Sequence, residues 1–279
     1  MASIGQRNAL QVIREATPGF YLDGENLGEI LLPGRYIPEN TGPGDYVLVF
    51  IHRDSEDRLV ATTEIPNARV GEFAYLKVVS ANPQIGAFLD WGLAKDLLLP
   101  IREQSRRVEV GEWVIVYVFL DEQSGRIVAT MRVEAHLDLT APSYVEEQPV
   151  NLLIAGETSL GYKAIVENAH WGLIFRSDIG SALTLGEALT GYVRAVRPDG
   201  KIDLSLTLPG YGKVRSLTEE ILEGLKKNNG RMNINDASSP EEIRRQFATS
   251  KKAFKQALGA LYRKRAIRLT KEGIELSEG

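Results

Sequence analysis

Short runs of alternating polar and apolar residues dominate roughly the first three quarters of the chain. Residues 201–206 alternate strictly, as expected for a strand that buries one face. Gly, Asn, Asp and Pro separate these runs, and the 26 Gly and 12 Pro among 279 residues fit a structure with many tight turns. The pattern therefore predicts a mainly β structure up to residue 213.

The front half of the chain contains an internal repeat with an offset of 67 residues. The matching blocks are residues 19–23 with 86–90, 29–33 with 96–100, 44–50 with 111–117 and, after a one-residue slip, 58–62 with 126–130. A third, more divergent copy covers residues 160–206. Each copy holds about five short strands and no convincing helix. This predicts small closed barrels, because closure removes the edge strands that so small a sheet would expose.

The apolar period changes from two to about 3.6 residues at Ser216. A first helix is expected to end at Gly230, a second to begin at Ser239 and a third to be capped by Ser250. Residues 266–276 have the pattern of a β-hairpin. Three helices followed by a hairpin resemble a winged helix.

The net charge of −4 hides a strong asymmetry along the chain. Residues 1–149 carry 13 Lys and Arg against 22 Asp and Glu, a net charge of −9, whereas residues 150–214 carry six of each. Residues 215–279 carry 14 basic and nine acidic residues, a net charge of +5. Such asymmetry indicates an anion-binding end, although a basic surface of this size also occurs where lysines merely face water.

The order of motifs in residues 156–206 resembles the ribosomal protein S1 RNA-binding domain, a five-stranded OB-fold. A glycine-aromatic strand is followed by a Gly-Leu-Ile strand, a glycine-led valine strand and a closing Asp-Gly-Lys-Ile-Asp-Leu-Ser-Leu segment. The resemblance implies that aromatic residues on the second and third strands, with basic residues near the last strands, form the RNA surface. It places Tyr162 at the strand aromatic, Phe175 at the usual histidine and Lys201 at the closing basic position.

The two front copies depart from this pattern, although they keep an aromatic residue at Tyr21 and Phe88. Leu32 and Leu99 take the place of the histidine, and each is followed by a proline, which lacks a backbone donor. Together with their acidic balance, these departures predict that the front copies act as spacers.

Three S1-like domains followed by a winged helix are similar to the bacterial conserved virulence factor B family over nearly the whole chain. Residues 191–206 and 250–262 are the most specific parts of this resemblance. The expected fold class is multidomain and mainly β, with three tandem S1-type OB-fold five-stranded barrels and an α+β winged-helix domain. The expected domain limits are 1–66, 67–146, 147–213 and 214–279. The resemblance implies RNA binding and an influence on gene expression.

The sequence lacks the usual motifs of catalysis and of membrane insertion. It has no Cys, three widely separated His, no phosphate-binding Gly-x-x-x-x-Gly-Lys-Ser/Thr loop and no Gly-x-Ser-x-Gly elbow. We therefore expect a protein that is no enzyme and binds no metal or cofactor. It contains no run of about 18 apolar residues and no secretory signal pattern, so a cytoplasmic protein without membrane contact is expected.

The leading hypothesis is a non-catalytic regulator that binds single-stranded RNA, with aromatic rings stacked on bases and basic side chains along the phosphates. The expected RNA-binding residues are Tyr162, His170, Phe175, Arg194, Arg197, Lys201, Lys251, Lys252, Lys255, Arg263, Lys264 and Arg265. Tyr162 and Phe175 are expected to be exposed, because they match surface positions of the family. Trp171 either stacks on a base beside His170 or, as the better supported interpretation, fills the barrel.

Two other functions fit the same sequence. The acidic front domains suit docking of a basic protein, which would make the chain an interaction scaffold associated with the ribosome or the polymerase. The winged helix also suits contact with duplex DNA, because the third helix of such domains meets nucleic acid.

Overall fold

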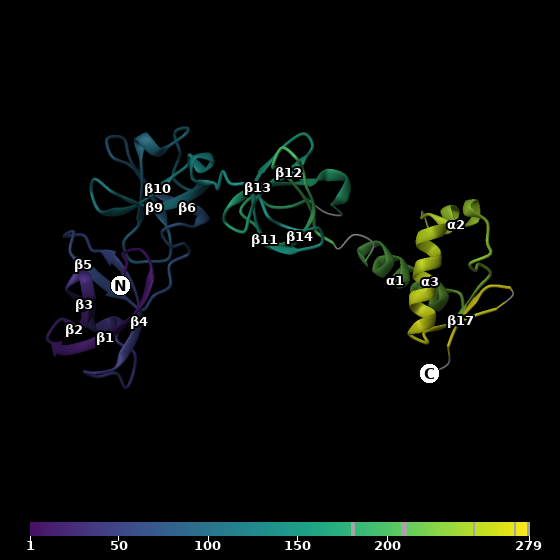
Figure 1. The fold of residues 1–279 in the computed structure, drawn as a ribbon, viewed down its shortest axis with the longest axis horizontal. Helices are drawn as coiled ribbons and strands as arrows, with labels where there is room; N and C mark the ends of the chain where they lie inside the picture. Colours follow the sequence, from purple (N-terminus) through teal and green to yellow (C-terminus); the bar gives the residue numbers. More distant parts are fainter. Residues whose placement is uncertain (180–181, 208–210, 248, 271, 278–279) are drawn as a thin grey trace. The chain divides into compact units, whose positions relative to one another are not determined.

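The computed structural model describes residues 1–179, 182–207, 211–247, 249–270 and 272–277. Within these residues the chain forms three closed five-stranded barrels and then a region of three helices with a small sheet (Figure 1). This architecture confirms the expected mainly β, multidomain fold. The chain divides into two compact units, residues 1–142 with 151–189 and residues 143–150 with 190–279.

The first two barrels share the same element order. The first contains β1 (Arg7–Ala16), β2 (Gly19–Asp23), β3 (Glu29–Pro33), β4 (Tyr46–Arg53) and β5 (Leu59–Thr62). The second contains β6 (Phe73–Asn82), β7 (Gly86–Asp90), β8 (Leu97–Pro100), β9 (Trp113–Asp121) and β10 (Arg126–Thr130). In both, the third and fifth strands run parallel and close the barrel, through Leu31 opposite Val60 and Leu98 opposite Val128.

The third barrel follows the same order, β11-β12-β13-β15-β14. Its strands are β11 (Pro149–Glu157), β12 (Gly161–Val166), β13 (His170–Phe175), β14 (Ala188–Val196) and β15 (Ile202–Ser205). The repeat predicted from the sequence is therefore present three times in the structure.

One glycine begins the second strand of every barrel, and its conformation fixes the register. Gly19, Gly86 and Gly161 have φ values of 146°, 149° and 157°, a region that other residues rarely adopt. A Cβ on any of them would lie 2.0–2.2 Å from a backbone carbonyl oxygen of the next strand. Because the glycine cannot move along the strand, the residue after it faces the interior and the following residue faces outward.

A buried hydroxyl closes each barrel at the equivalent position of its last strand. Thr62 and Thr130 are fully buried, and Ser205 is 9% exposed. Their hydroxyl oxygens accept a hydrogen bond from the backbone N–H two residues later, at 3.0 Å from Glu64, 3.0 Å from Arg132 and 3.2 Å from Thr207. These bonds satisfy polar groups that burial would otherwise leave unpaired.

Within the first unit, the second barrel contacts the outer face of β12 and β13. Ile165, which is 1% exposed, packs with Phe73 and Val133 of the second barrel. Asn168, in the turn after β12, accepts a hydrogen bond from the Phe73 N–H at 2.8 Å and donates to the Gly71 carbonyl at 2.6 Å. Apolar contacts and hydrogen bonds therefore both fix this joint.

The C-terminal region contains three helices and a three-stranded sheet of order β16-β18-β17. Its elements are α1 (Tyr211–Lys227), β16 (Arg231–Met232), α2 (Pro240–Phe247), α3 (Lys251–Arg263), β17 (Ile267–Leu269) and β18 (Ile274–Leu276). The Ser250 side chain caps α3 by accepting from the Ala253 N–H, as the sequence predicts. Helix α1 begins before Ser216, so the expected domain limit at 214 falls inside a helix.

The core of this region is built from one face of each long helix. Ile221 and Leu225 of α1 and Phe254, Leu258 and Leu261 of α3 are at most 2% exposed. The α3 positions follow the i, i+4, i+7 spacing of one helical face, so the opposite face of α3 is left to solvent. No helix among the described residues is long and apolar enough to cross a bilayer.

Candidate nucleic-acid interface

Tyr162 faces the interior of the third barrel and is only 7% exposed. Gly161 pairs with Phe175 across β12 and β13, and Tyr162 pairs with the fully buried Ile174. Counted from the glycine, Tyr162 is therefore equivalent to the buried Phe20 of the first barrel. The expectation of an exposed Tyr162 ring is wrong, because the residue directly after this glycine faces inward, whereas the resemblance assigned Tyr162 to an outward position.

The outward position of β12 belongs to Lys163. It lies two residues after the glycine, as do Tyr21 in β2 and Phe88 in β7, and all three are half-buried. The third barrel therefore carries a cation where the front barrels carry an aromatic ring. This reverses the sequence interpretation, in which the third copy kept the family's strand aromatic.

Phe175 ends β13 and is half-buried. The glycines of the front barrels pair with Pro33 and Pro100, so these prolines are the equivalents of Phe175. The expectation that Leu32 and Leu99 occupy this position is wrong, since both are fully buried one residue earlier.

His170 and Trp171 begin β13, and alternation along the strand turns their side chains to opposite faces. The His170 Nε2 lies 3.2 Å from the Thr140 carbonyl oxygen, and His170 is half-buried. Trp171 pairs with Ile165 and packs in the apolar cluster that joins the second and third barrels. The interpretation that Trp171 fills its own barrel is therefore wrong, because the partner of this ring is the neighbouring barrel.

Arg194, Arg197 and Lys201 are exposed on β14 and on the turn before β15. Arg197 forms an ion pair with Asp203 at 2.8 Å, and Lys201 forms one with Asp199 at 2.7 Å. The hydrogen bond from Lys201 lowers the pKa of Asp199 below its ordinary value. Both side chains of the Lys201–Asp199 pair are exposed and water screens their attraction, so Lys201 can exchange its carboxylate for a phosphate at little cost.

The outer face of α3 is basic. Lys252, Lys255 and Arg263 are exposed on the helix, and Lys264 and Arg265 are exposed at its exit. Lys251 is half-buried, and its Nζ donates to the Ala237 carbonyl at 3.3 Å. Every basic residue predicted for this helix except Lys251 is thus presented to solvent.

Tyr262 stands among these cations, and sequence reasoning missed it. Its side chain is 57% exposed, next to Arg263, although it lies on a helix with a large buried face. The signal was available, because Tyr262 follows Leu261 and so lies outside the i, i+4, i+7 positions of the core. Proteins that bind single-stranded nucleic acids combine exposed aromatic rings, which stack on bases, with cations that neutralise phosphates.

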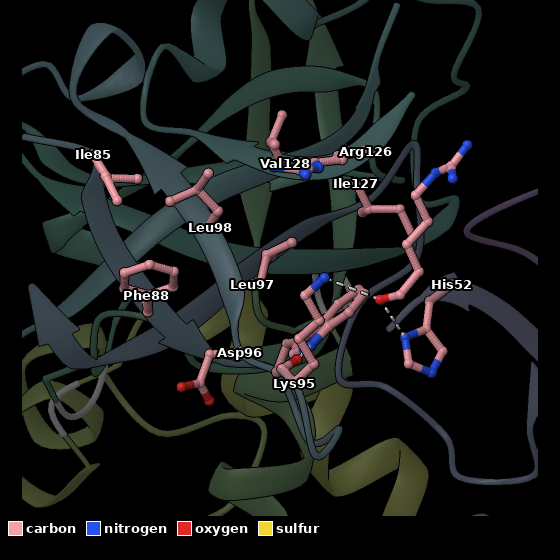
Figure 2. A pocket seen from close by; sticks show the side chains of 12 residues that line it. His52, Ile85, Phe88, Lys95, Asp96, Leu97, Leu98, Arg126, Ile127 and Val128 are labelled. Atoms are coloured by element: carbon pink, nitrogen blue, oxygen red, sulfur yellow. Dashed lines mark hydrogen bonds between the residues drawn. The ribbon is translucent and has the colours of Figure 1, made fainter. Parts of the chain in front are cut away.

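The outward aromatic residues of the front barrels lie in different surroundings. The Arg14 guanidinium lies 3.8 Å from the centroid of the Tyr21 ring and donates to Glu29 at 2.7 Å. Phe88 lines an apolar recess of about 230 Å³ with Ile85 and Leu98 (Figure 2).

The charged residues around this recess bind groups of the first barrel. The Lys95 Nζ donates to the carbonyls of Arg53 and Asp54 at 3.2 and 2.7 Å, and Arg126 donates to Asp57 at 3.0 Å. The recess therefore acts chiefly as the joint between the first two barrels. Among the described residues, no group of three or more His, Asp or Glu side chains is arranged to hold a metal ion.

Comparisons with known families match both parts of this architecture. Residues 4–64 and 70–132 match the S1 domain family, and residues 219–276 match the CvfB-like winged helix domain. The S1 match thus covers the two front barrels, whose sequences departed most from the expected pattern. S1 and winged-helix domains are nucleic-acid-binding families, and neither is a known catalytic family.

Whole-chain comparisons extend the similarity beyond single domains. The protein YitL of Bacillus subtilis is 31% identical over 92% of this chain and 88% of its own length. Conserved virulence factor B of Staphylococcus epidermidis is 24% identical over 99% of this chain and 95% of its own length. A solved structure of a multidomain protein with nucleic acid binding domains from Streptococcus pneumoniae is 24% identical, covers 98% of both chains and has a TM-score of 0.41.

The similarity to YitL spans both the barrel repeat and the winged-helix region. YitL aligns with almost all of the chain, and proteins named conserved virulence factor B align over the same span. The chain therefore belongs to the conserved virulence factor B family.

Proposed function

We propose that this protein is a non-catalytic, single-stranded RNA-binding regulator of gene expression. Its S1 barrels and its winged helix both support a nucleic-acid partner. The observation that carries the proposal is the exposed Tyr262 ring beside Arg263, Lys264 and Arg265 at the end of α3. A ring that is 57% exposed can stack on an unpaired base, whereas bases inside a duplex are already stacked on each other.

The third barrel supplies further contacts in this proposal. Arg194, Arg197 and Lys201 contact phosphates, while Phe175 and His170 contribute ring surface. On α3, Lys252 and Lys255 extend the cationic surface. Lys251 lies at the edge of this surface, because its Nζ donates a hydrogen bond to the Ala237 carbonyl. In this proposal the basic side chains neutralise phosphates, and the rings stack on bases.

Fluorescence anisotropy of the full chain tests the proposal with labelled single-stranded RNA, single-stranded DNA of the same sequence and duplex DNA, over a salt series. The RNA strand is expected to bind most tightly. Replacing Lys252 and Lys255 together by Ala should flatten the log–log salt slope by about 0.7 for each lost phosphate contact. Replacement of Lys226 and Lys227, which are exposed at the end of α1, removes the same charge and should leave the slope nearly unchanged.

Two outcomes contradict the proposal. If duplex DNA binds more tightly than RNA, the winged helix is a module for duplex DNA binding and not for RNA binding. Absence of binding to all three nucleic acids, with capture of a basic protein by the acidic residues 1–149, would favour the interaction scaffold.

A further inference from the structure

A groove of about 580 Å³ lies between the second and third barrels, inside the first compact unit. Its volume is within the range of about 300–1,000 Å³ that is typical of ligand sites. Its walls come mainly from β9 and the segment before it, from the segment after β10, and from β11, β12 and β13. Because the Asn168 hydrogen bonds and the Ile165 cluster fix these walls against each other, the groove is already formed without a ligand.

The groove is positively charged within an acidic half of the chain. Arg106, Arg132 and Lys163 line it, and the only carboxylate among its lining residues is Glu134. Glu112, beside the groove, forms an ion pair with Arg106 at 2.9 Å, so the groove and its border carry an excess of one positive charge, where residues 1–149 as a whole have a net charge of −9. The charge therefore favours an anionic occupant.

A tryptophan at the edge of the groove offers a stacking surface. Trp113 is 50% exposed, and Tyr75 supports it with ring centroids 5.3 Å apart and an interplanar angle of 29°. Tyr75 packs against the indole, and Trp113 lines the groove. A large ring held in place by a second ring loses little freedom when a planar ligand stacks on it.

A second tryptophan supplies a hydrogen-bond donor. The Trp171 Nε1 is buried and has no hydrogen-bond partner, and it is the only such side-chain nitrogen or oxygen among the described residues. Buried donors are rarely left unpaired in native structures, and Trp171 lines the groove, so an acceptor supplied by a ligand would satisfy this N–H. Lys163 covers the Trp171 ring at 4.0 Å, and Glu134 lies 3.8 Å from the Lys163 Nζ.

We propose that this groove binds one nucleotide of a single-stranded RNA. The base stacks on Trp113, an acceptor on its edge takes the Trp171 N–H, and the adjoining phosphates pair with Arg106 and Arg132. The site rests on the proposed RNA-binding function, and it places an RNA contact on the front barrels that their acidic sequence does not predict. An acidic peptide would use the cations alone, whereas a nucleotide uses the ring, the donor and the cations together.

The test is anisotropy of the full chain with a labelled single-stranded RNA. Trp113→Ala is expected to weaken binding by about 5- to 150-fold, the range for loss of one stacked base. Tyr46→Ala is the matched control, because Tyr46 is the equivalent residue of the first barrel, is 71% exposed and does not line the groove. The control should bind within about twofold of the unmodified protein, since surface substitutions away from a site have small effects.

Two further variants separate stacking, hydrogen bonding and charge. Trp171→Phe keeps a ring but removes the N–H, and it should weaken binding without changing the salt slope. Arg132→Ala should instead flatten the salt slope by about 0.7. Uridine monophosphate, used as a competitor, should bind far more weakly than the strand, and equal affinity would assign the groove to a free nucleotide.

The outcomes distinguish this site from the function on which it rests. If the unmodified protein binds RNA and Trp113→Ala, Trp171→Phe and Arg132→Ala all bind equally well, the groove proposal is overturned while RNA binding stands. If the unmodified protein binds no RNA, both proposals fail. Unfolding midpoints of each variant identify any that misfold, and the exposed Trp113 and Arg132 positions keep the test decisive if Trp171→Phe is unstable.

Discussion

The Lys163 ammonium nitrogen lies 4.0 Å from the centroid of the Trp171 ring, on the outer face of β12 and β13. Such cation–π contacts are worth about 0.5–1 kcal/mol at exposed sites and more where water is excluded. Here the contact faces the second barrel, because Trp171 belongs to the cluster around Phe73 and Val133. The outer face of the third barrel therefore serves at once as a domain joint and as a wall of the groove.

Replacing Tyr162 distinguishes a core residue from an RNA contact. Because its side chain is 7% exposed, Tyr162→Ala should leave a cavity and lower the free energy of unfolding by about 3–5 kcal/mol. RNA affinity should fall only as far as the folded fraction falls. Urea midpoints measured alongside anisotropy check both statements.

Phe175→Ala provides the comparison for Tyr162→Ala. Phe175 is half-buried at the end of its strand, so its loss should cost less stability than the loss of Tyr162. An unfolding midpoint for Tyr162→Ala close to that of the unmodified protein, combined with a large loss of RNA affinity, would restore Tyr162 as a surface residue.

The barrel repeat was predictable from the sequence, but the placement of single rings was not. Matching blocks at 19–23 and 86–90 fix the strands, because strand alternation and turn residues are local properties. Tyr162 and Lys163 both follow Gly161, and only the cross-strand register decides which of them faces inward. The surroundings of Trp171 depend on a neighbouring barrel, and no local pattern contains that information.

The third helix shows the opposite case. Its cap at Ser250, its buried face and its exposed cations all follow from spacing within one helix, and the structure has each of them. The start of α1 was misplaced because its first turn lies outside the apolar period that begins with Leu217. Local periodicity thus locates the body of a helix better than its end.

Gly161→Ala tests the claim that a glycine fixes the register of the third barrel. The added Cβ would lie 2.0 Å from the Ile174 carbonyl oxygen, and φ is 157°. Backbone strain of this kind costs roughly 1–3 kcal/mol, and relief of the clash requires β12 and β13 to separate. The thermal unfolding midpoint of Gly161→Ala should be clearly lower than that of the unmodified protein. Gly156→Ala, in the neighbouring strand with open space at its Cβ position, should be nearly neutral, and equal losses for the two variants would contradict the argument.

The stability of the protein should fall as the pH drops below about 6.5, the ordinary pKa of histidine. Burial lowers the pKa of His52, and the hydrogen bond to the Arg53 carbonyl opposes this only in part. Burial also lowers the pKa of His136. The unfolded chain then takes up protons that the folded chain does not, so stability is complete above this pH and is lost below it.

His52→Gln isolates the contribution of the first of these histidines. Glutamine keeps a donor for the Arg53 carbonyl but does not titrate. Urea midpoints measured between about pH 7.5 and 5.5 should fall less steeply in this variant than in the unmodified protein. An unmodified protein that is equally stable at both ends of this range would show that His52 is protonated as easily in the folded chain as in the unfolded one.

Asn168→Gly tests whether two hydrogen bonds hold the second and third barrels together. Asn168 has a left-handed backbone with φ of 54°, so glycine preserves the turn while removing the amide that binds Phe73 and Gly71. Loss of two hydrogen bonds worth about 0.5–1.5 kcal/mol each should lower the urea midpoint. Asn40→Gly is the matched control, because Asn40 has the same backbone conformation, with φ of 58°, on an exposed turn of the first barrel. If the joint also shapes the groove, Asn168→Gly should weaken RNA binding and Asn40→Gly should not. Identical midpoints for the two variants would show that the apolar cluster around Ile165 holds the barrels without the amide.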